Sequence, residues 1–216
     1  MSFDNQWEKI YKKKEQINQY PFDTVVSAVN NLFDKKTASK QKVLDLGCGT
    51  GNNLRFFLDF GFKDVTGVEG SESAIKIANK ILPRNKCNLV FKDFTKYKIS
   101  KNKFDLILDR GSITHNKKKD IKKVLRKIYL GLSINGYFIS HLFSKKHTEF
   151  KRIKQKQAFK SSMNLKKQIQ ASFFSKNEIE SFFKNFKIIS LSHSINSELK
   201  TNYIQGYWHI ICKRKK

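Results

Sequence analysis

Hydrophobic positions along the chain follow two alternating spacings. Short, nearly continuous apolar runs that end near a glycine or an acidic residue are typical of buried parallel strands. Longer stretches place apolar residues three and four positions apart, as amphipathic helices do. Strands are expected at 42–47, 63–69, 87–94, 103–109 and 136–143, and helices at 52–62, 71–82 and 118–132. Strands separated by helices in this way predict a doubly wound α/β sheet.

The N-terminal part of the chain is predicted to be helical. Within residues 5–34, Trp7 and Tyr11 share one helical face, and a second apolar stripe follows Pro21. Proline is well tolerated in the first turn of a helix, so Pro21 is expected to open the second of two helices.

Residues 143–172 interrupt the alternation. This segment is polar, strongly basic and weakly periodic, so we expect a basic insertion or lid rather than a core element. Ser175, with Glu178 three residues later, has the pattern of a capping box at the start of a helix. The apolar runs at 187–195 and 202–215 predict an antiparallel pair of strands at the sheet edge.

The composition fits one globular domain over residues 1–216. With 39% hydrophobic and 13% aromatic residues, the chain can bury a core of its own. No apolar run approaches the roughly 18–20 residues that cross a bilayer, and the N-terminus lacks the apolar stretch of a secretory signal. The 3 cysteines show no C-x-x-C spacing and no even number for a disulfide framework, so we expect a cytoplasmic protein.

The formal net charge of +26 is the most unusual number in the composition. Clustered cations favour nucleic acid because binding releases counterions. Here, however, lysine far outnumbers arginine, the residue that binds bases and phosphates through paired hydrogen bonds, and the lysines are scattered. A nucleic-acid partner is therefore not favoured, whereas a small anionic acceptor would be attracted by the same charge.

The stretch VLDLGCGTGNN (43–53) carries the most informative motif. A predicted strand ends at Asp45, and Gly47, Gly49 and Gly51 form a G-x-G-x-G turn before a helix. Glycines at such a turn adopt positive φ and let a ligand lie against bare backbone. A dinucleotide fingerprint would need another glycine where Asn52 stands, and the lysine of a phosphate-binding P-loop is missing. These two nucleotide-binding motifs are therefore excluded.

With D-x-G-x-G-x-G at a strand end, the sequence resembles the class I S-adenosylmethionine-dependent methyltransferases. The N-terminal W-x-x-I-Y pattern (7–11), followed by YPFD (20–23), also resembles small bacterial enzymes of this class that modify sugars and other small metabolites. The resemblance covers residues from about 40 to 140. It implies a Rossmann-like fold, with a doubly wound, mostly parallel seven-stranded sheet, an antiparallel edge strand and N-terminal helices (1–40) that cover the cofactor. The implied cofactor is S-adenosyl-L-methionine. Trp7 and Tyr11 are candidates for its cover, although core packing explains these aromatic residues equally well.

The resemblance also implies cofactor contacts at successive strand ends. Asp45 would accept a hydrogen bond from the cofactor ammonium, and Glu69 would accept from both ribose hydroxyls. Asp93 would accept from the adenine amine, while Phe94 would cover the ring. A carboxylate that only caps a helix or turn would look the same at Glu69 or Asp93. The predicted cofactor-binding residues are Trp7, Tyr11, Asp45, Gly47, Cys48, Gly49, Gly51, Asn52, Glu69, Gly70, Asp93, Phe94 and Asp109.

The stretch FDLILDRGSITHN (104–116) contains the residue types of a Ser-His-Asp triad. Ser112 and His115 follow Asp109 within a few residues, but a nucleophile elbow would need the pattern G-x-S-x-G. Triad partners also come from distant segments rather than from one short loop. Ligands in this fold bind beyond the carboxyl ends of the strands, so we interpret this loop as the wall that faces the methyl acceptor.

Other methyl-transfer chemistries have signatures that the chain lacks. The loop holds no [N/D]-P-P-[Y/F] motif, and no proline is followed by a nucleophilic cysteine. A metal-dependent mechanism would rest on Asp109, His115 and His141, and we predict no metal site.

The remaining mechanism is base-assisted or proximity-driven transfer. His115 is the first candidate for the general base and His141 the second, although a capping or core histidine would give the same pattern. Arg110 would hold an anionic acceptor or the cofactor carboxylate. We predict methyl transfer to a small molecule, through a hydroxyl of a sugar or phosphate-bearing metabolite, by a monomer or homodimer. RNA methylation, or a non-catalytic cofactor- or nucleic-acid-binding module of the same fold, are the alternatives.

Overall fold

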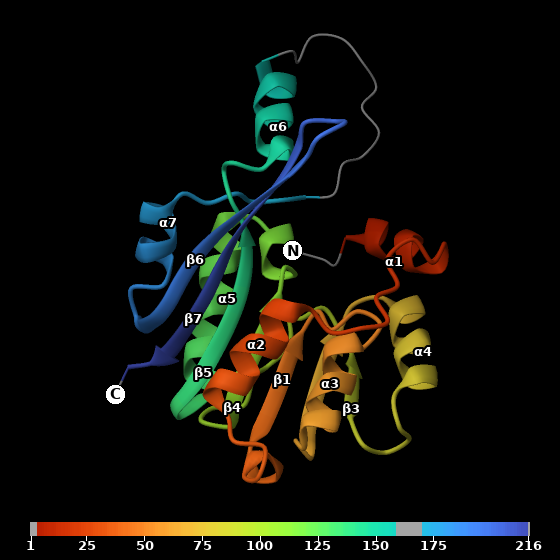
Figure 1. The fold of residues 1–216 in the computed structure, drawn as a ribbon. Coiled ribbons are helices and arrows are strands. Elements are labelled where there is room, and N and C mark those ends of the chain that lie inside the picture. The colour runs from red at the N-terminus through yellow and green to blue at the C-terminus, as the bar shows by residue number, and fades with distance from the viewer. Residues whose placement is uncertain (1–3, 159–169, 216) are drawn as a thin grey trace.

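In the computed structural model, which describes residues 4–158 and 170–215, seven strands form one sheet in the order β3-β2-β1-β4-β5-β7-β6 (Figure 1). The strands are β1 (Lys42–Leu46), β2 (Asp64–Glu69), β3 (Asn88–Phe91), β4 (Phe104–Arg110), β5 (Leu132–Phe143), β6 (Phe186–Glu198) and β7 (Tyr203–Arg214). β1 to β5 pair in parallel, and β7 is antiparallel to both β5 and β6. The predicted doubly wound, mostly parallel sheet with an antiparallel pair at its edge is confirmed.

Helices cover both faces of this sheet (Figure 1). The helices are α1 (Asn5–Lys12), α2 (Asp23–Leu32), α3 (Asn52–Phe60), α4 (Glu72–Ile81), α5 (Lys118–Gly131), α6 (Thr148–Ala158) and α7 (Lys176–Phe182), with 3-10 turns η1 (Ala38–Lys40) and η2 (Ile113–His115). α2, α3 and α4 share one hydrophobic cluster with sheet residues such as Val43 and Leu106. α5 and α7 share the other cluster with Leu44 and Ile107. Adjacent strand residues thus point to opposite faces, and because both faces are covered, the strands are continuously apolar.

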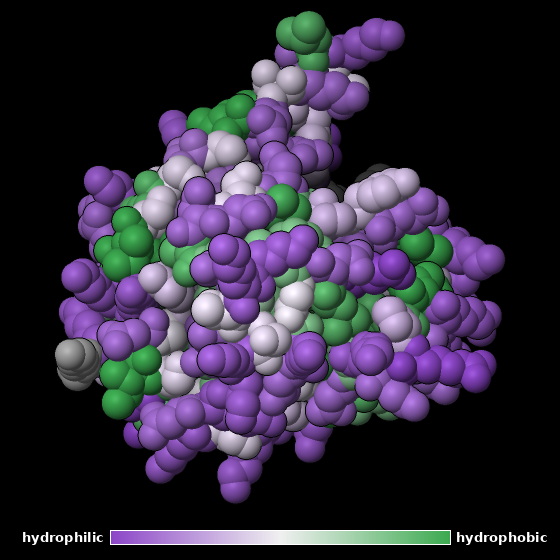
Figure 2. Space-filling view, turned by 60° about the horizontal axis from the view of Figure 1, so that its bottom comes forward, coloured by the Kyte–Doolittle hydropathy of each residue, from purple (hydrophilic) through white to green (hydrophobic). Residues whose placement is uncertain are grey.

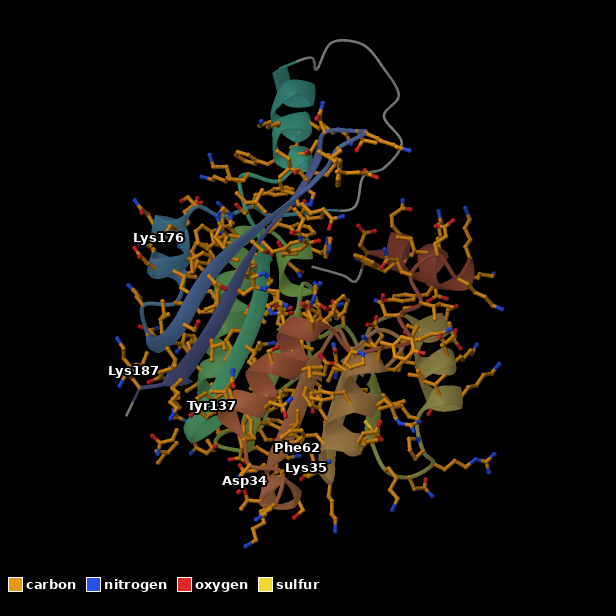
Figure 3. The ribbon with its side chains drawn as sticks, viewed as in Figure 1. Asp34, Lys35, Phe62, Tyr137, Lys176 and Lys187 are labelled. Atoms are coloured by element: carbon orange, nitrogen blue, oxygen red, sulfur yellow. The ribbon has the colours of Figure 1, made fainter. Side chains whose placement is uncertain are left out.

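The parallel register brings the carboxyl ends of β1, β2 and β4 to one edge of the sheet. Leu46 is opposite Val68, and Asp45 is opposite Leu108, so the loops that follow these strands meet. α1 lies beyond this edge (Figure 1). Asp34 and Lys35 mark the opposite end of the molecule (Figure 3). A ligand site at the α1 end is what this topology favours.

Two predicted helix starts are confirmed by their caps. The Ser71 hydroxyl accepts a hydrogen bond from the Ala74 N–H at the start of α4. Ser175 and Glu178 form the capping box that opens α7. Several strand boundaries were wrong. β3 ends at Phe91 rather than at residue 94, β6 runs on to Glu198 rather than ending at residue 195, and β5 begins at Leu132 rather than after the turn sequence INGY. In the β4–β5 pairing, Phe104 is opposite Leu132 but Leu106 is opposite Tyr137, so β5 contains an irregularity between these two pairs. Asn135, within it, has a φ of +68°.

The basic segment after β5 contains one further helix. α6 and the turn between β6 and β7 project together from the body of the molecule (Figure 1). Residues 159–169 of the predicted insertion lie outside the described residues, and its function as a lid stays a prediction.

The face drawn in Figure 2 is hydrophilic over most of its area. Figure 2 shows charged and polar side chains spread over one face, with only small, separate apolar patches between them. Lys176 of α7 and Lys187 of β6 lie on the outer side of the molecule (Figure 3). Within residues 4–158 and 170–215, no helix combines the length and apolar character needed to cross a membrane.

Candidate cofactor and acceptor site

The glycine turn after β1 forms the floor of the site. Gly47 and Gly49 have φ values of +69° and +54°, in the left-handed region that favours glycine. A Cβ at Gly47 would lie 2.2 Å from the Ser112 hydroxyl oxygen, and one at Gly49 would lie 2.7 Å from the Tyr11 hydroxyl. The Gly47 N–H donates to the Val68 carbonyl at 2.7 Å, which fixes the turn to β2. Both glycines line the pocket, and a side chain at either position would collide with Ser112 or Tyr11.

Asp45 lies beneath this turn and is 1% exposed. Its Oδ2 atom is buried and has no hydrogen-bond partner within the described residues. Burial, together with the charges of Asp109 and Glu69, raises the pKa of Asp45 well above its ordinary value. A buried carboxylate oxygen without a donor is costly unless a cation or donor is supplied from outside the chain.

Glu69, at the end of β2, is buried and joins two loops. One carboxylate oxygen accepts from the Gly49 N–H at 2.9 Å, and the other accepts from the Ser71 N–H at 2.8 Å. Burial raises the pKa of Glu69, and these backbone hydrogen bonds partly offset that effect. Each oxygen keeps acceptor capacity for a further donor, so Glu69 both shapes the site and can accept hydrogen bonds from hydroxyl groups.

Asp93 and Phe94 follow β3 on the same side of the sheet. The Oδ1 atom of Asp93 accepts from the Thr95 N–H at 2.8 Å and from the Thr95 hydroxyl at 2.7 Å. Its Oδ2 atom is buried and has no partner within the described residues. The Phe94 ring approaches Gly47, with one ring carbon 3.8 Å from a Cβ built there. An amine donor placed beside this ring would satisfy Asp93.

The N-terminal helix α1 covers the glycine turn. The Tyr11 hydroxyl lies over Gly49, and Trp7 packs edge-on against His115 with ring centroids 4.8 Å apart. Burial and the charge of Glu69 raise the pKa of Tyr11, so its hydroxyl stays protonated. The carboxylate of Glu8, on the same helix, accepts hydrogen bonds from Ser71 and Ser73 at the start of α4.

Asp109 holds the loop after β4 in shape. Its Oδ1 atom accepts from the Ser112 and Ile113 N–H groups at 2.8 and 2.9 Å, and its Oδ2 atom accepts from the Ser140 hydroxyl at 2.8 Å. Burial raises the pKa of Asp109 to about 6, although these hydrogen bonds oppose the shift. Asp109 is 0% exposed and does not reach the pocket, so the structure gives it a loop-forming role at that place.

One pocket of about 1090 Å³ connects these parts. Of the predicted site residues, those that line it are Trp7, Tyr11, Gly47, Cys48, Gly49, Asn52, Glu69, Gly70, Asp93, Phe94, Arg110 and His115. Four others lie outside its wall, namely Asp45, Gly51, Asp109 and His141. Gly51 begins α3 and packs against Leu82 instead.

His115 faces Trp7 on one side and Phe143, at 5.3 Å between ring centroids, on another. Its Nδ1 atom is 3.1 Å from the Gln170 carbonyl oxygen. Since a carbonyl oxygen only accepts, this contact places the proton of the neutral ring on Nδ1 and leaves Nε2 as an acceptor. Burial lowers the pKa of His115 to about 4, so the ring is neutral near pH 7.

The sequence did not identify the residues that complete the wall beside Arg110. Phe22 packs on the guanidinium, whose central carbon is 3.7 Å from the ring centroid, and Tyr207 lies at 5.5 Å. Gln205 and Phe143 also line this part of the pocket. Phe22 immediately precedes α2, Phe143 ends β5, and Gln205 and Tyr207 lie on β7, so the residues of this wall come from segments far apart in the sequence.

No group of three or more His, Cys, Asp or Glu side chains is arranged to hold a metal ion within the described parts of the chain. The residues present do fit S-adenosylmethionine. The unpartnered Oδ2 atom of Asp93 and the remaining acceptor capacity of Glu69 lie in the pocket wall and suit an amine and hydroxyl groups, whereas Asp45 lies beneath the glycine turn and outside that wall.

Known proteins with a similar sequence include methyltransferases. A family model described as a methyltransferase domain matches residues 37–187. Human EEF1A lysine methyltransferase 2 is 27% identical over 153 residues, which cover 62% of this chain and 64% of that protein. The chain spans less than two thirds of the length of the first curated relatives that it matches, 47% for an uncharacterised Haemophilus influenzae protein.

Solved structures share the fold. A putative S-adenosylmethionine-dependent methyltransferase from Listeria monocytogenes superposes with a TM-score of 0.70 at 18% identity, over 89% of this chain and 99% of that chain. The 1,6-didemethyltoxoflavin-N1-methyltransferase of Burkholderia thailandensis, with bound 1,6-didemethyltoxoflavin and S-adenosylhomocysteine, gives 0.66 at 16%, over 98% and 87%. The chain therefore belongs to the methyltransferase family, in the class I fold whose cofactor is S-adenosylmethionine.

Proposed function

We propose that the protein methylates a hydroxyl group of a small molecule, a sugar or a phosphate-bearing metabolite. The observation that carries this proposal is the single pocket in which the glycine turn, Glu69 and Asp93 share a space with Arg110 and His115. α1 covers this space from outside, through Trp7 and Tyr11. A pocket of about 1090 Å³ has room for a cofactor and a small acceptor side by side.

The cofactor, when bound, supplies a methyl group activated by its positively charged sulfur. The chain's own task is then to orient the acceptor, exclude water and remove a proton. In the proposed arrangement, Asp45 accepts from the cofactor ammonium, Glu69 from its ribose hydroxyls and Asp93 from its adenine amine. The roles of Asp93 and Glu69 are supported by the unpartnered Oδ2 atom of Asp93 and the remaining acceptor capacity of Glu69, both in the pocket wall. The role of Asp45, which lies beneath the turn and outside that wall, is supported by its unpartnered Oδ2 atom and by the family resemblance.

His115 is the proposed general base. Its Nε2 atom is the unprotonated nitrogen, and its neighbours Trp7 and Phe143 are aromatic, so an acceptor hydroxyl would meet a neutral imidazole flanked by aromatic rings. As the hydroxyl oxygen gains the methyl group, its proton would pass to Nε2. The pKa of His115, lowered to about 4, keeps this nitrogen free to accept at neutral pH.

A labelling experiment tests the proposal. The protein is incubated with methyl-tritiated S-adenosylmethionine and, separately, with a small-metabolite fraction and with total RNA. We expect label in the small-metabolite fraction and none in RNA, with the transfer lost in Glu69→Ala. Label in RNA alone would support RNA methylation, for which the net charge of +26 is the argument. Cofactor binding without transfer to either fraction would support a non-catalytic module.

A further inference from the structure

Arg110 is a largely buried cation without a counter-ion. The Nε atom of its guanidinium is fully buried and has no hydrogen-bond partner within the described residues. In the same part of the chain, no carboxylate lies within 4.0 Å of it, whereas Arg55 and Arg152 each pair with an acidic side chain. Burial lowers the pKa of Arg110, although Tyr207, Asp109 and Asp23 oppose that shift. Removing a charge from water in this way is costly unless a partner is provided.

The nearest acidic groups are already engaged elsewhere. Asp109 uses both oxygens for the Ser112 and Ile113 N–H groups and the Ser140 hydroxyl. Asp23, at the start of α2, accepts from the Thr24 N–H at 2.7 Å. Neither carboxylate forms an ion pair with the guanidinium, so within the described residues their charges offset its burial only from a distance.

Arg110, His141 and His209 lie side by side on three neighbouring strands, β4, β5 and β7. His141 is opposite Arg110 in the β4–β5 ladder, and His209 is opposite His141 in the β5–β7 ladder. The two imidazole rings meet edge-on at 4.6 Å, and the Nδ1 atom of each is buried without a partner within the described residues. His141 is 2% exposed. The ladders thus surround Arg110 with further nitrogens and no carboxylate on this row.

We propose that Arg110 binds an anionic oxygen group, a carboxylate or a phosphate, on the methyl acceptor. This inference rests on the proposed function, because it places the anion in the same pocket. Of Arg110, His141 and His209, Arg110 is the one that lines the pocket. Its neighbours in the pocket wall are Phe22, Tyr207 and Gln205. Phe22 packs on the face of the guanidinium at 3.7 Å, so the N–H groups at its edge are the part left for a ligand. That edge matches two oxygens of a carboxylate or phosphate.

The same geometry disfavours a cationic acceptor. The human relative is a lysine methyltransferase by name, but a lysine side chain entering here would approach a largely buried guanidinium that forms no direct ion pair with a carboxylate of the described residues. Like charges at close range in a site of low dielectric repel strongly. Arg110 is accordingly a specificity-determining residue that selects anionic small molecules.

Simple aromatic probes test this inference. Benzoate, phenyl phosphate and neutral benzamide are titrated by calorimetry into the protein saturated with S-adenosylhomocysteine. We expect one of the two anions to bind at least about tenfold more tightly than benzamide, in line with a charge-assisted bidentate contact. The stronger of the two anions identifies the chemistry of the group. Equal binding of all three probes would overturn the inference, whereas failure of S-adenosylhomocysteine to bind would overturn the proposed function instead.

Three variants locate the effect. Arg110→Met should remove the preference for anions, and Arg110→Lys should restore part of it because the charge returns without the planar edge. Arg126→Met, on the exposed side of α5, is the matched control and should bind as the wild type does. Should Arg110→Met weaken S-adenosylhomocysteine tenfold while its circular dichroism is unchanged, Arg110 would serve the cofactor carboxylate and the inference would be wrong. Should Arg110→Met fail to fold, the wild-type ranking and Arg110→Lys still decide.

Discussion

The carboxylate of Glu8 accepts a hydrogen bond of 2.6 Å from the hydroxyl of Ser71, across 63 positions of the chain. The hydroxyl of Ser73 donates to the same carboxylate at 2.5 Å. Ser71 also caps α4 and donates its N–H to Glu69, so α1 is fastened to the residues that shape the cofactor pocket. The position of α1 over the pocket and the position of Glu69 are thus linked through Ser71.

Glu8→Ala should loosen α1 and weaken S-adenosylmethionine. The lost hydrogen bonds involve a charged acceptor at a partly exposed place, which is worth about 1 kcal/mol, so we expect a roughly fivefold higher Kd by calorimetry. Although burial opposes it, hydrogen bonding to Ser71 and Ser73 lowers the pKa of Glu8 from 4.5. The stabilisation from the Glu8 hydrogen bonds to Ser71 and Ser73, which we call the clasp, is therefore complete above pH 4.5 and is lost as the pH falls through the lowered pKa of Glu8. Glu15→Ala, an exposed change after α1, should leave the Kd unaltered, and an unaltered Kd in Glu8→Ala would refute the clasp.

Gly49→Ala should displace α1 by steric conflict. The new Cβ would lie 2.7 Å from the Tyr11 hydroxyl and would also occupy a φ of +54°, which costs about 1–2 kcal/mol for a residue with a side chain. We expect weaker cofactor binding and a lower melting temperature. Adding Tyr11→Phe should recover part of the binding but not the melting temperature, because it removes the clashing oxygen and leaves the backbone strain. If the double variant binds no better than Gly49→Ala, Tyr11 does not cover the turn.

The half of the site built around β1 and β2 was predictable because its signals are local. Asp45, the glycine turn and the start of α3 follow one another within a few residues, and Glu69 stands at the next strand end. Parallel pairing then brings these neighbours in sequence together in space. The periodicity likewise predicted the helices and the sheet, since each strand is buried on both faces.

The other half depends on contacts between distant segments, which no local pattern encodes. Phe22 and Tyr207 reach Arg110 only because α2 docks on the sheet and β7 returns antiparallel beside β5. Asp109 shows the opposite error. Its position at a strand end predicted a ligand contact, but it lies outside the pocket wall. Its hydrogen bonds to Ser112 and Ser140 become visible only once the loop and β5 are placed.

Glu69→Gln should reduce S-adenosylmethionine affinity by more than tenfold. The amide keeps the size of the side chain, but its NH₂ group would face either the Gly49 or the Ser71 N–H, so one backbone donor loses its acceptor. Binding by calorimetry and unfolding by urea should both be affected. Glu72→Gln, on the exposed first turn of α4, is the control for binding, because it removes only an exposed ion pair with Lys76 and should keep the wild-type Kd. Wild-type affinity in Glu69→Gln, with lowered stability alone, would leave Glu69 a loop-shaping role and remove its proposed contact with the ribose.

His115→Ala should reduce methyl transfer by roughly 10²–10⁴-fold, the usual contribution of a general base, while cofactor binding is kept. His193→Ala, outside the pocket, should transfer at the wild-type rate. Because burial lowers the pKa of His115 from 6.5 to about 4, His115 should remain neutral and able to accept a proton at pH 5.5, and its own titration by NMR should centre near pH 4. The lowered pKa of His115 also makes the free energy of unfolding depend on pH.

Between pH 6.5 and 4 the unfolded chain binds a proton at His115 that the folded chain does not. The free energy of unfolding should therefore fall as the pH is lowered through this window, and this part of the slope should vanish in His115→Ala. Urea titrations of both proteins at several pH values measure the difference between their slopes. A His115 that titrates near 6.5 in the folded protein would show that this imidazole is exposed to water. Full turnover in His115→Ala would show that the acceptor proton leaves by another route.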